Sequence, residues 1–150
     1  MKQRTWFLAA LLFATAACGV RVFDRWRGEP VVAREIAAPV PILWRHISGR
    51  AGELDLVLAK IRSEEFVLEF DWVTVPGDGR LYLRCAEAGT IGNASIRPRI
   101  QLRPSATGNA LVIETKVRAT TTEACTSTGH FERWLLNRLE PAIQQAVTSA

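Results

Sequence analysis

Histidine and cysteine are scarce in this sequence, which contains two histidines and three cysteines among its 150 residues. Neither His46 nor His130 has another histidine or a cysteine at metal-ligand spacing, so the sequence predicts no metal site. A glycine-rich phosphate loop and the G-x-S-x-G motif of serine hydrolases are also absent. We therefore expect neither a cofactor nor catalytic activity. An alternative is a nucleophilic pair of Cys125 with His130, which would require a free thiol.

A long hydrophobic run is missing as well. The apolar stretch Trp6–Ala17 has about half of the ~20 residues that a membrane-spanning helix needs. Lys2 and Arg4 precede it and small residues end it, which is the pattern of a secretory signal peptide. We therefore assign residues 1–17 to a signal peptide, with an uncleaved membrane anchor as an alternative.

The end of this stretch offers two cleavage sites. Residues 15–18, TAAC, resemble the lipobox of bacterial lipoproteins, in which the cysteine is lipidated and becomes the first residue. The resemblance implies a lipid on Cys18 that anchors the protein in a membrane, with residues 18–29 as a short tether. Gly19 after that cysteine implies the outer membrane rather than the inner one. Cleavage after residues 14–16, ATA, would instead release a soluble secreted protein.

Three cysteines are an odd number for an exported protein. A lipid on Cys18 would leave Cys85 and Cys125 to pair, and such a disulfide would persist in the oxidising periplasm. The bridge would close a loop of about 40 residues, which the chain-entropy model equates with roughly 4 kcal/mol of stabilisation. The alternative is a pair of buried free thiols.

The positive charge of the mature chain is small. The formal net charge of +4 falls by two units when Lys2 and Arg4 leave with the signal peptide. So small an excess in an exported protein argues against nucleic acid as a partner. Lysine is nearly absent after residue 17, where only Lys60 and Lys116 remain, so arginine supplies most of the positive charge.

Residues 30–150 are predicted to form a single α+β domain. Its first half contains a strand at residues 30–37, a helix from Pro41 to about Gly49, and a second helix at residues 53–64. The second helix rests on apolar residues at helical spacing, namely Leu54, Val57, Leu58 and Ile61.

Period-two alternation then predicts an antiparallel meander of four strands at residues 66–73, 80–86, 94–103 and 111–120. A helix begins at about Gly129 and presents an apolar stripe to the sheet, formed by Phe131, Trp134, Leu135, Leu139 and Ile143. Pro141 predicts a kink or a break in this helix.

This order of elements resembles the helix-grip (START-like) superfamily, in which a curved antiparallel sheet wraps a long C-terminal helix. Residues 34–44, REIAAPVPILW, are similar to its strand-to-helix junction. Residues 125–136, CTSTGHFERWLL, resemble the segment before the last helix of small proteobacterial envelope lipoproteins. Similar domains occur in BamC-type lipoproteins of the outer-membrane assembly machinery. The resemblance implies four to five strands packed on the terminal helix, with two short helices after the first strand.

Basic residues alternate with apolar ones in the last two predicted strands. If these strands pair, the outward cations become neighbours on one face of the sheet. We call this set the basic face; it comprises Arg97, Arg99, Arg103, Lys116 and Arg118, with Glu114 among them. It could bind lipid phosphates, acidic glycolipid or an acidic protein, or it could be a solvated face on which Glu114 pairs locally. Pro98 suggests an edge strand or a bulge.

These observations predict a non-catalytic lipoprotein that faces the periplasm, in the outer membrane. We expect it to bind a protein partner in the assembly or maintenance of the envelope. The alternative is a binding module that holds a lipid or a small apolar ligand between the sheet and the C-terminal helix.

Overall fold

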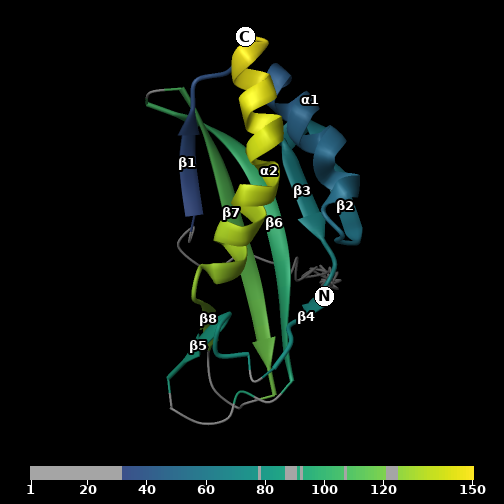
Figure 1. Cartoon of the computed structure of the whole chain (residues 1–150), viewed down its shortest axis with the longest axis vertical. Helices are drawn as coiled ribbons and strands as arrows, with labels where there is room; N and C mark the ends of the chain where they lie inside the picture. The colour runs from purple at the N-terminus through teal and green to yellow at the C-terminus, as the bar shows by residue number, and fades with distance from the viewer. Residues whose placement is uncertain (1–31, 78, 87–90, 92, 107, 121–124) are drawn as a thin grey trace, which may run out of the picture.

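One long helix lies along an antiparallel sheet, with a second helix beside it (Figure 1). The computed structural model describes residues 32–77, 79–86, 91, 93–106, 108–120 and 125–150. The helices are α1 (Val40–Arg50) and α2 (His130–Thr148). The main sheet comprises β1 (Val32–Ile36), β2 (Leu58–Arg62), β3 (Val67–Phe70), β4 (Val73–Thr74), β6 (Ala94–Ser105) and β7 (Gly108–Ala119). A second sheet pairs β5 (Leu83–Cys85) with β8 (Cys125–Ser127). The predicted α+β class, with a long C-terminal helix, is confirmed.

The two longest strands form the centre of the main sheet. Its order is β1-β7-β6-β3-β2, and β4 is a further neighbour of β6. β6 and β7 pair without a register shift, from Ala94 opposite Ala119 to Ser105 opposite Gly108. Alternate residues of β6 are buried in the core, and the residues between them face the other side of the sheet. This is the period-two pattern that the sequence predicts for these strands.

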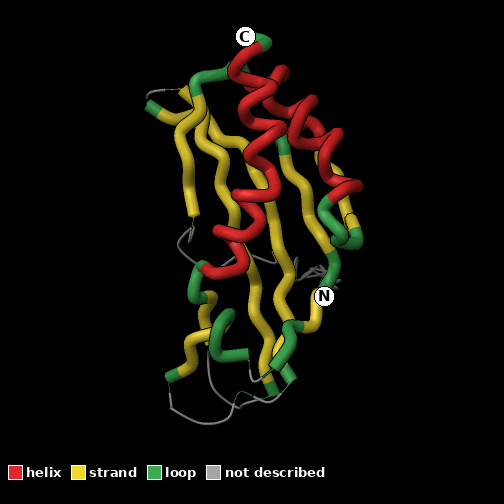
Figure 2. The backbone as a smooth tube through the Cα atoms, viewed as in Figure 1, coloured by secondary structure: helices red, strands yellow, loops and turns green. Residues whose placement is uncertain are grey.

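The core lies between the sheet and the helices, which are the red tubes in front of the yellow strands in Figure 2. Leu135, Leu139 and Ile143 follow one side of α2 at helical spacing and are at most 1% exposed. On the sheet side, Ile100 and Ile113 are fully buried. Burial of such a side chain contributes about 1.5–3 kcal/mol, so this layer is the main source of stability.

A single short helix follows β1. Pro41 stands in the first turn of α1, where its missing N–H leaves no hydrogen bond unmade. Leu43 and Ile47, one turn apart, are fully buried in the core. Two 3-10 turns, η1 (Ala51–Glu53) and η2 (Ser63–Glu65), flank the next strand.

Residues 53–64 do not form the second helix that the sequence predicts. Asp55 takes a left-handed conformation with a φ of 57°, which is incompatible with a continuing helix. The segment instead forms β2, whose register against β3 shifts between Leu58 and Lys60. Because the bulge adds one residue, Leu58 and Ile61 face the same side although they are three residues apart. That spacing imitates one turn of an amphipathic helix.

The strand predicted at residues 80–86 is also placed differently. It shortens to β5 and pairs with β8, so it does not belong to a continuous meander. Pro98 lies in the middle of β6, opposite Thr115, without a register shift, so the predicted edge or bulge is wrong. β3 pairs with β6 only at residues 99–101 and β4 only at residues 95–96. Pro98 therefore occupies the gap between two neighbours, where no backbone donor is needed.

Two expectations about α2 are corrected as well. Pro141 lies inside the helix, which continues without interruption to Thr148, so no break occurs there. Trp134 is 38% exposed and is not part of the buried stripe. The stripe is completed instead by smaller residues, Ala142 and Ala146.

Candidate functional site

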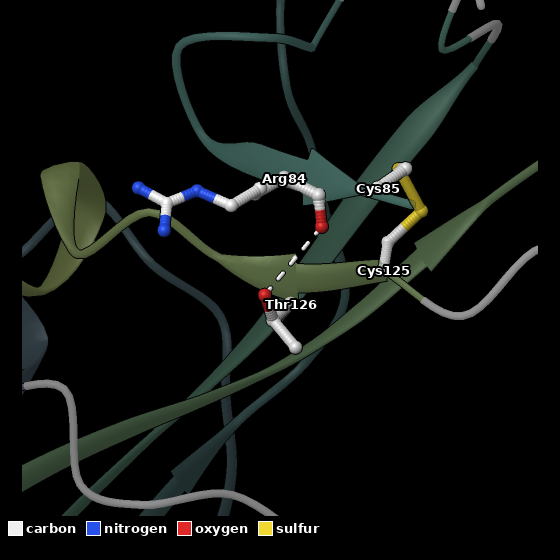
Figure 3. Close-up of a disulfide and its surroundings, with 4 residues drawn as sticks. All are labelled: Arg84, Cys85, Cys125 and Thr126. Atoms are coloured by element: carbon white, nitrogen blue, oxygen red, sulfur yellow. Dashed lines mark hydrogen bonds between the residues drawn. A yellow bond between two sulfur atoms is a disulfide. The ribbon is translucent and has the colours of Figure 1, made fainter. Parts of the chain in front are cut away.

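The predicted disulfide is present between Cys85 and Cys125 (Figure 3). The two cysteines stand directly opposite each other in the β5–β8 pair, with Cα atoms 4.2 Å apart. Next to the bridge, the Thr126 hydroxyl donates a hydrogen bond of 3.5 Å to the backbone carbonyl of Arg84. A bonded Cys125 cannot supply the thiolate that a Cys–His pair requires.

Several predictions fall on residues outside the described part of the chain. These are the signal peptide at residues 1–17, the tether at residues 18–29 and the lipidation of Cys18. Among the helices that the structure describes, none is long and apolar enough to cross a bilayer.

The five cations of the basic face lie together on the side of the sheet turned away from the core. Arg97 stands opposite Lys116 in the β6–β7 pair, and Arg118 stands opposite Ser95. Arg99 stands opposite Glu114, and Arg103 stands two positions further along β6 on the same face, beyond Gln101. Glu114 is the one carboxylate on this face of the two strands.

Glu114 forms ion pairs with the arginines in the half of the basic face that is nearer the β6–β7 turn. It lies 3.0 Å from Arg103 and 3.8 Å from Arg99. The side chains of Arg99 and Glu114 are only 13% and 11% exposed. Burial lowers the pKa of the Arg99 guanidinium, and the neighbouring Glu114 carboxylate opposes that effect. Local pairing of Glu114, the alternative that the sequence left open, is therefore present in this half.

The side chains of Val67 and Val112 also lie on this face and are buried. Both stand opposite Gln101, one on each neighbouring strand. The stems of long side chains can cover apolar surface while their charged groups stay in water. This half of the face is therefore a packed layer in which one carboxylate pairs with two arginines.

The other half of the basic face comprises Arg97, Lys116 and Arg118. Arg97 donates a 3.1 Å hydrogen bond to the carbonyl of Phe70 and lies 3.8 Å from Glu69. Glu69 also pairs closely with Arg62 of β2, so one carboxylate is shared by two arginines. Arg118 lies over the ring of Trp72 at 4.2 Å, which is a cation–π contact. Lys116 stands opposite Arg97 in the ladder, so three cations lie close together in this half.

An exposed row of side chains on α2 was not predicted. His130, Trp134 and Arg138 are four residues apart and therefore share one side of the helix. The His130 and Tyr82 rings form a T-shaped pair with centroids 5.5 Å apart, and the Arg138 guanidinium lies 5.8 Å from the centroid of the Trp134 ring. We call Tyr82, His130, Trp134 and Arg138 the aromatic row. Leu81, next to it in sequence, is 55% exposed.

The row escaped sequence analysis because Trp134 fits two helical patterns. It is one residue from Leu135 and three from Phe131, so helical spacing assigns it to the apolar stripe. The spacing of His130, Trp134 and Arg138 at four-residue intervals was the available signal. The second histidine, His46, lies half-buried in α1 and belongs to no such row.

Glu132 is a second residue that the sequence did not single out. It is fully buried in the first turn of α2, where its carboxylate accepts hydrogen bonds from the hydroxyls of Thr115 and Ser127. A negative charge near a helix N-terminus is favourable. Glu132 thereby joins three elements: β7, β8 and α2.

Neither a metal-binding group nor a similarity to known proteins identifies further functional residues. Over the described ranges, no three histidine, cysteine, aspartate or glutamate side chains are grouped so as to hold a metal ion. A comparison with protein-family models gives no match, and a comparison with curated proteins gives none either.

Proposed function

We propose that this protein is a non-catalytic lipoprotein, held in the outer membrane by a lipid on Cys18, whose periplasmic domain binds a protein partner of the envelope assembly or maintenance machinery. The lipid anchor is supported by the TAAC motif after a short apolar run. The disulfide of Cys85 and Cys125 is consistent with an oxidising compartment. A relation to helix-grip or BamC-like domains stays a prediction, supported by the order of the elements.

The observation that carries the protein-binding proposal is the exposure of Trp134. Tryptophan, tyrosine and arginine are the residues that most often dominate the energy of protein interfaces. The aromatic row contains one of each, and contacts between the side chains hold them in place. A preorganised row loses less side-chain entropy on binding than flexible side chains would.

The packing between α2 and the sheet favours a protein partner over an enclosed ligand. An internal site for a lipid or an apolar molecule would place its lining residues on this layer. The facing side chains Leu111, Ile113, Leu135 and Leu139 are fully buried against other protein atoms.

The test introduces a photo-reactive amino acid into the aromatic row and is carried out in cells. Trp134→benzoylphenylalanine should cross-link the protein to an envelope protein, whereas Arg133→benzoylphenylalanine, next to it on the exposed surface of α2, should not. Trp134→Ala should reduce recovery of the same partner at least tenfold from membrane extracts. Recovery unchanged by Trp134→Ala, or recovery of bound lipid alone, would overturn the proposal.

The anchor is tested separately. Cys18→Ser should move the protein from the membrane fraction to the soluble fraction, and the natural protein should show the added mass of acyl chains. An unshifted distribution with an unmodified mass would refute lipidation.

A further inference from the structure

The main sheet ends at β2, and the outer edge of this strand is accessible. Among the described residues, β2 pairs with β3 on one side and no strand lies on its other side. Figure 1 shows β2 at the margin of the sheet, on the side of α1. Three consecutive residues in it are exposed, namely Ala59, Lys60 and Ile61. An edge of this kind presents backbone N–H and C=O groups with which a further strand can pair.

Ile61 extends the apolar core to this edge. It stands opposite Leu68 of β3, which is fully buried in the core, yet Ile61 itself is 50% exposed. Val57, directly before β2, is 70% exposed. Because neighbouring strands lie about 4.8 Å apart, an added strand would place an apolar side chain against Ile61 and cover it.

The opposite end of the sheet does not have this property. β1 is the edge strand there among the described residues, and its five residues include no exposed large apolar side chain. Ile36 of β1 is only 4% exposed, and the exposed positions are Ala33 and Glu35. Only at the β2 edge would an added strand bury substantial apolar surface.

The charge of β2 restricts which strand can pair with it. Lys60 and Arg62 stand opposite Glu69 and Val67, on the face turned away from the core. The side chains of an added strand would lie beside these two cations at cross-strand distance. Opposite charges stabilise such a pair and like charges destabilise it. Acidic residues are therefore favoured at these positions of the partner.

A second copy of this chain does not meet that requirement. Two antiparallel β2 strands paired about their centres would set the Lys60 and Arg62 side chains of the two copies beside each other. Lysine on an edge strand is a common means of preventing self-association. The tether at residues 18–29 has three arginines against two acidic residues, so its charge is positive as well.

We infer that β2 accepts an extended segment of another protein as an added strand of the main sheet. The segment carries acidic residues beside Lys60 and Arg62 and apolar residues between them, beside Ile61. In this mode of recognition, main-chain hydrogen bonds supply affinity and alternate side chains supply specificity. The register shift between Leu58 and Lys60 leaves Lys60–Arg62 as the regular part of the edge. The inference goes beyond the proposed function and does not rest on the aromatic row.

The test uses the chain from residue 18 with Cys18→Ser, exported behind a signal peptide that is cleaved without lipidation. The probe is a synthetic peptide of about ten residues with glutamate at alternate positions and valine or threonine between them. A peptide with lysine in place of glutamate is the control. We expect the glutamate peptide to bind at least about tenfold more tightly, as measured by NMR titration.

Backbone pairing gives two signatures of its own. Amide hydrogen exchange of β2 should slow at least about tenfold when the glutamate peptide is bound, and that of β1 should not change. Alternate residues of a strand direct their N–H groups to opposite edges. The peptide is therefore N-methylated either on its glutamates or on the residues between them, and only one of the two forms should bind. These measurements use the unsubstituted edge, so they do not depend on the folding of any β2 variant.

Matched variants locate the contact. Ile61→Thr should weaken binding of the glutamate peptide about tenfold, and Lys60→Gln about threefold. Leu81→Thr removes an apolar side chain that is 55% exposed, and Arg45→Gln removes an exposed positive charge. Both controls should leave binding unchanged. Equal thermal unfolding of the four variants would show that they are folded.

Several results would overturn the inference. They are absent binding of the glutamate peptide at about 1 mM, equal binding of the two peptides, binding of both N-methylated forms, and equal loss in the control variants. A dimer that Ile61→Thr abolishes would assign the edge to a second copy instead. Cross-linking from Trp134 plays no part in these measurements, so a failure of the proposed function would leave them unchanged.

Discussion

The hydroxyl of Ser127 donates a 2.8 Å hydrogen bond to the carboxylate of Glu132, which is fully buried. Ser127 belongs to β8, and Glu132 belongs to the first turn of α2. Thr115 of β7 donates to the other carboxylate oxygen. A single carboxylate therefore ties the disulfide-linked strand pair to both the main sheet and the helix.

Glu132→Ala should be strongly destabilising. The substitution leaves two half-buried hydroxyls without their acceptor and removes the buried volume of the Glu132 side chain, which together cost about 2–4 kcal/mol. Glu132→Gln keeps one acceptor oxygen and the volume, so it should cost about half as much. Chemical denaturation of both variants measures the difference. A loss below about 0.5 kcal/mol for Glu132→Ala would show that these hydrogen bonds do not stabilise the fold.

The disulfide should stabilise the fold by constraining the unfolded chain. Cys85 and Cys125 are 40 residues apart, and the chain-entropy model gives about 4 kcal/mol for a loop of that size. Cys85→Ser with Cys125→Ser should lower the free energy of unfolding by up to that amount. The near-ultraviolet signal of Tyr82, which lies just before β5, should weaken as well. Intact mass before and after reduction and alkylation should show one bridge in the parent protein and none in the variant.

The ion pair between Arg34 and Glu140 should make stability depend weakly on pH. Hydrogen bonds from Arg34, and then from Gln144, lower the pKa of Glu140 below its ordinary value of 4.5. A lowered folded pKa means that the pair stabilises above pH 4.5 and that this contribution is lost as pH falls through the folded pKa. Both side chains are more than a third exposed, so the gain is below about 1 kcal/mol.

Glu140→Gln tests this relationship. At neutral pH the variant should be slightly less stable than the parent, and the difference should vanish in acid, where Glu140 is protonated. The difference should also shrink in high salt. A difference that persists unchanged at low pH would mean that packing rather than charge is responsible.

Truncation of two adjacent residues of α2 should destabilise the fold by different amounts. Leu135 is fully buried, so Leu135→Ala should cost about 2–5 kcal/mol. Trp134 is 38% exposed and contacts Phe131 at the surface, so Trp134→Ala should cost less than half as much. Denaturation midpoints of the two variants give the comparison. A larger loss for Trp134→Ala would show that the tryptophan is a core residue, as the sequence alone predicted.

That pair also shows what the sequence can and cannot predict. Strict alternation along β6 and β7 predicted which cations share a face, because period two is independent of neighbouring elements. The position of Trp134 depended on how α2 is turned toward the sheet, and the sequence of the helix does not contain that information. The sequence assigned β5 to the wrong sheet for a related reason, since its partner β8 lies 40 residues away.

The error at β2 has a different cause. The bulge places Leu58 and Ile61 on one side at a spacing of three, so an edge strand reproduces the pattern of a helix. Only the pairing with β3 distinguishes the two. On the basic face, alternation placed Arg99 and Arg103 correctly but could not show that Glu114 compensates them. That compensation depends on burial and on side-chain geometry.

Pro141 should reduce the stability of α2, although the helix continues through it. Proline lacks the N–H that would donate to the carbonyl of Asn137, and its cost in a helix interior is about 3 kcal/mol relative to alanine. Alanine gives the unfolded chain more freedom, which offsets only about 0.4–1 kcal/mol of that gain. Pro141→Ala should therefore raise the free energy of unfolding by roughly 1–3 kcal/mol. Arg133→Ala, at an exposed position of the same helix, should change it by less than about 0.5 kcal/mol. A loss of stability in Pro141→Ala, measured by thermal unfolding, would show that the path of α2 over the sheet requires the proline.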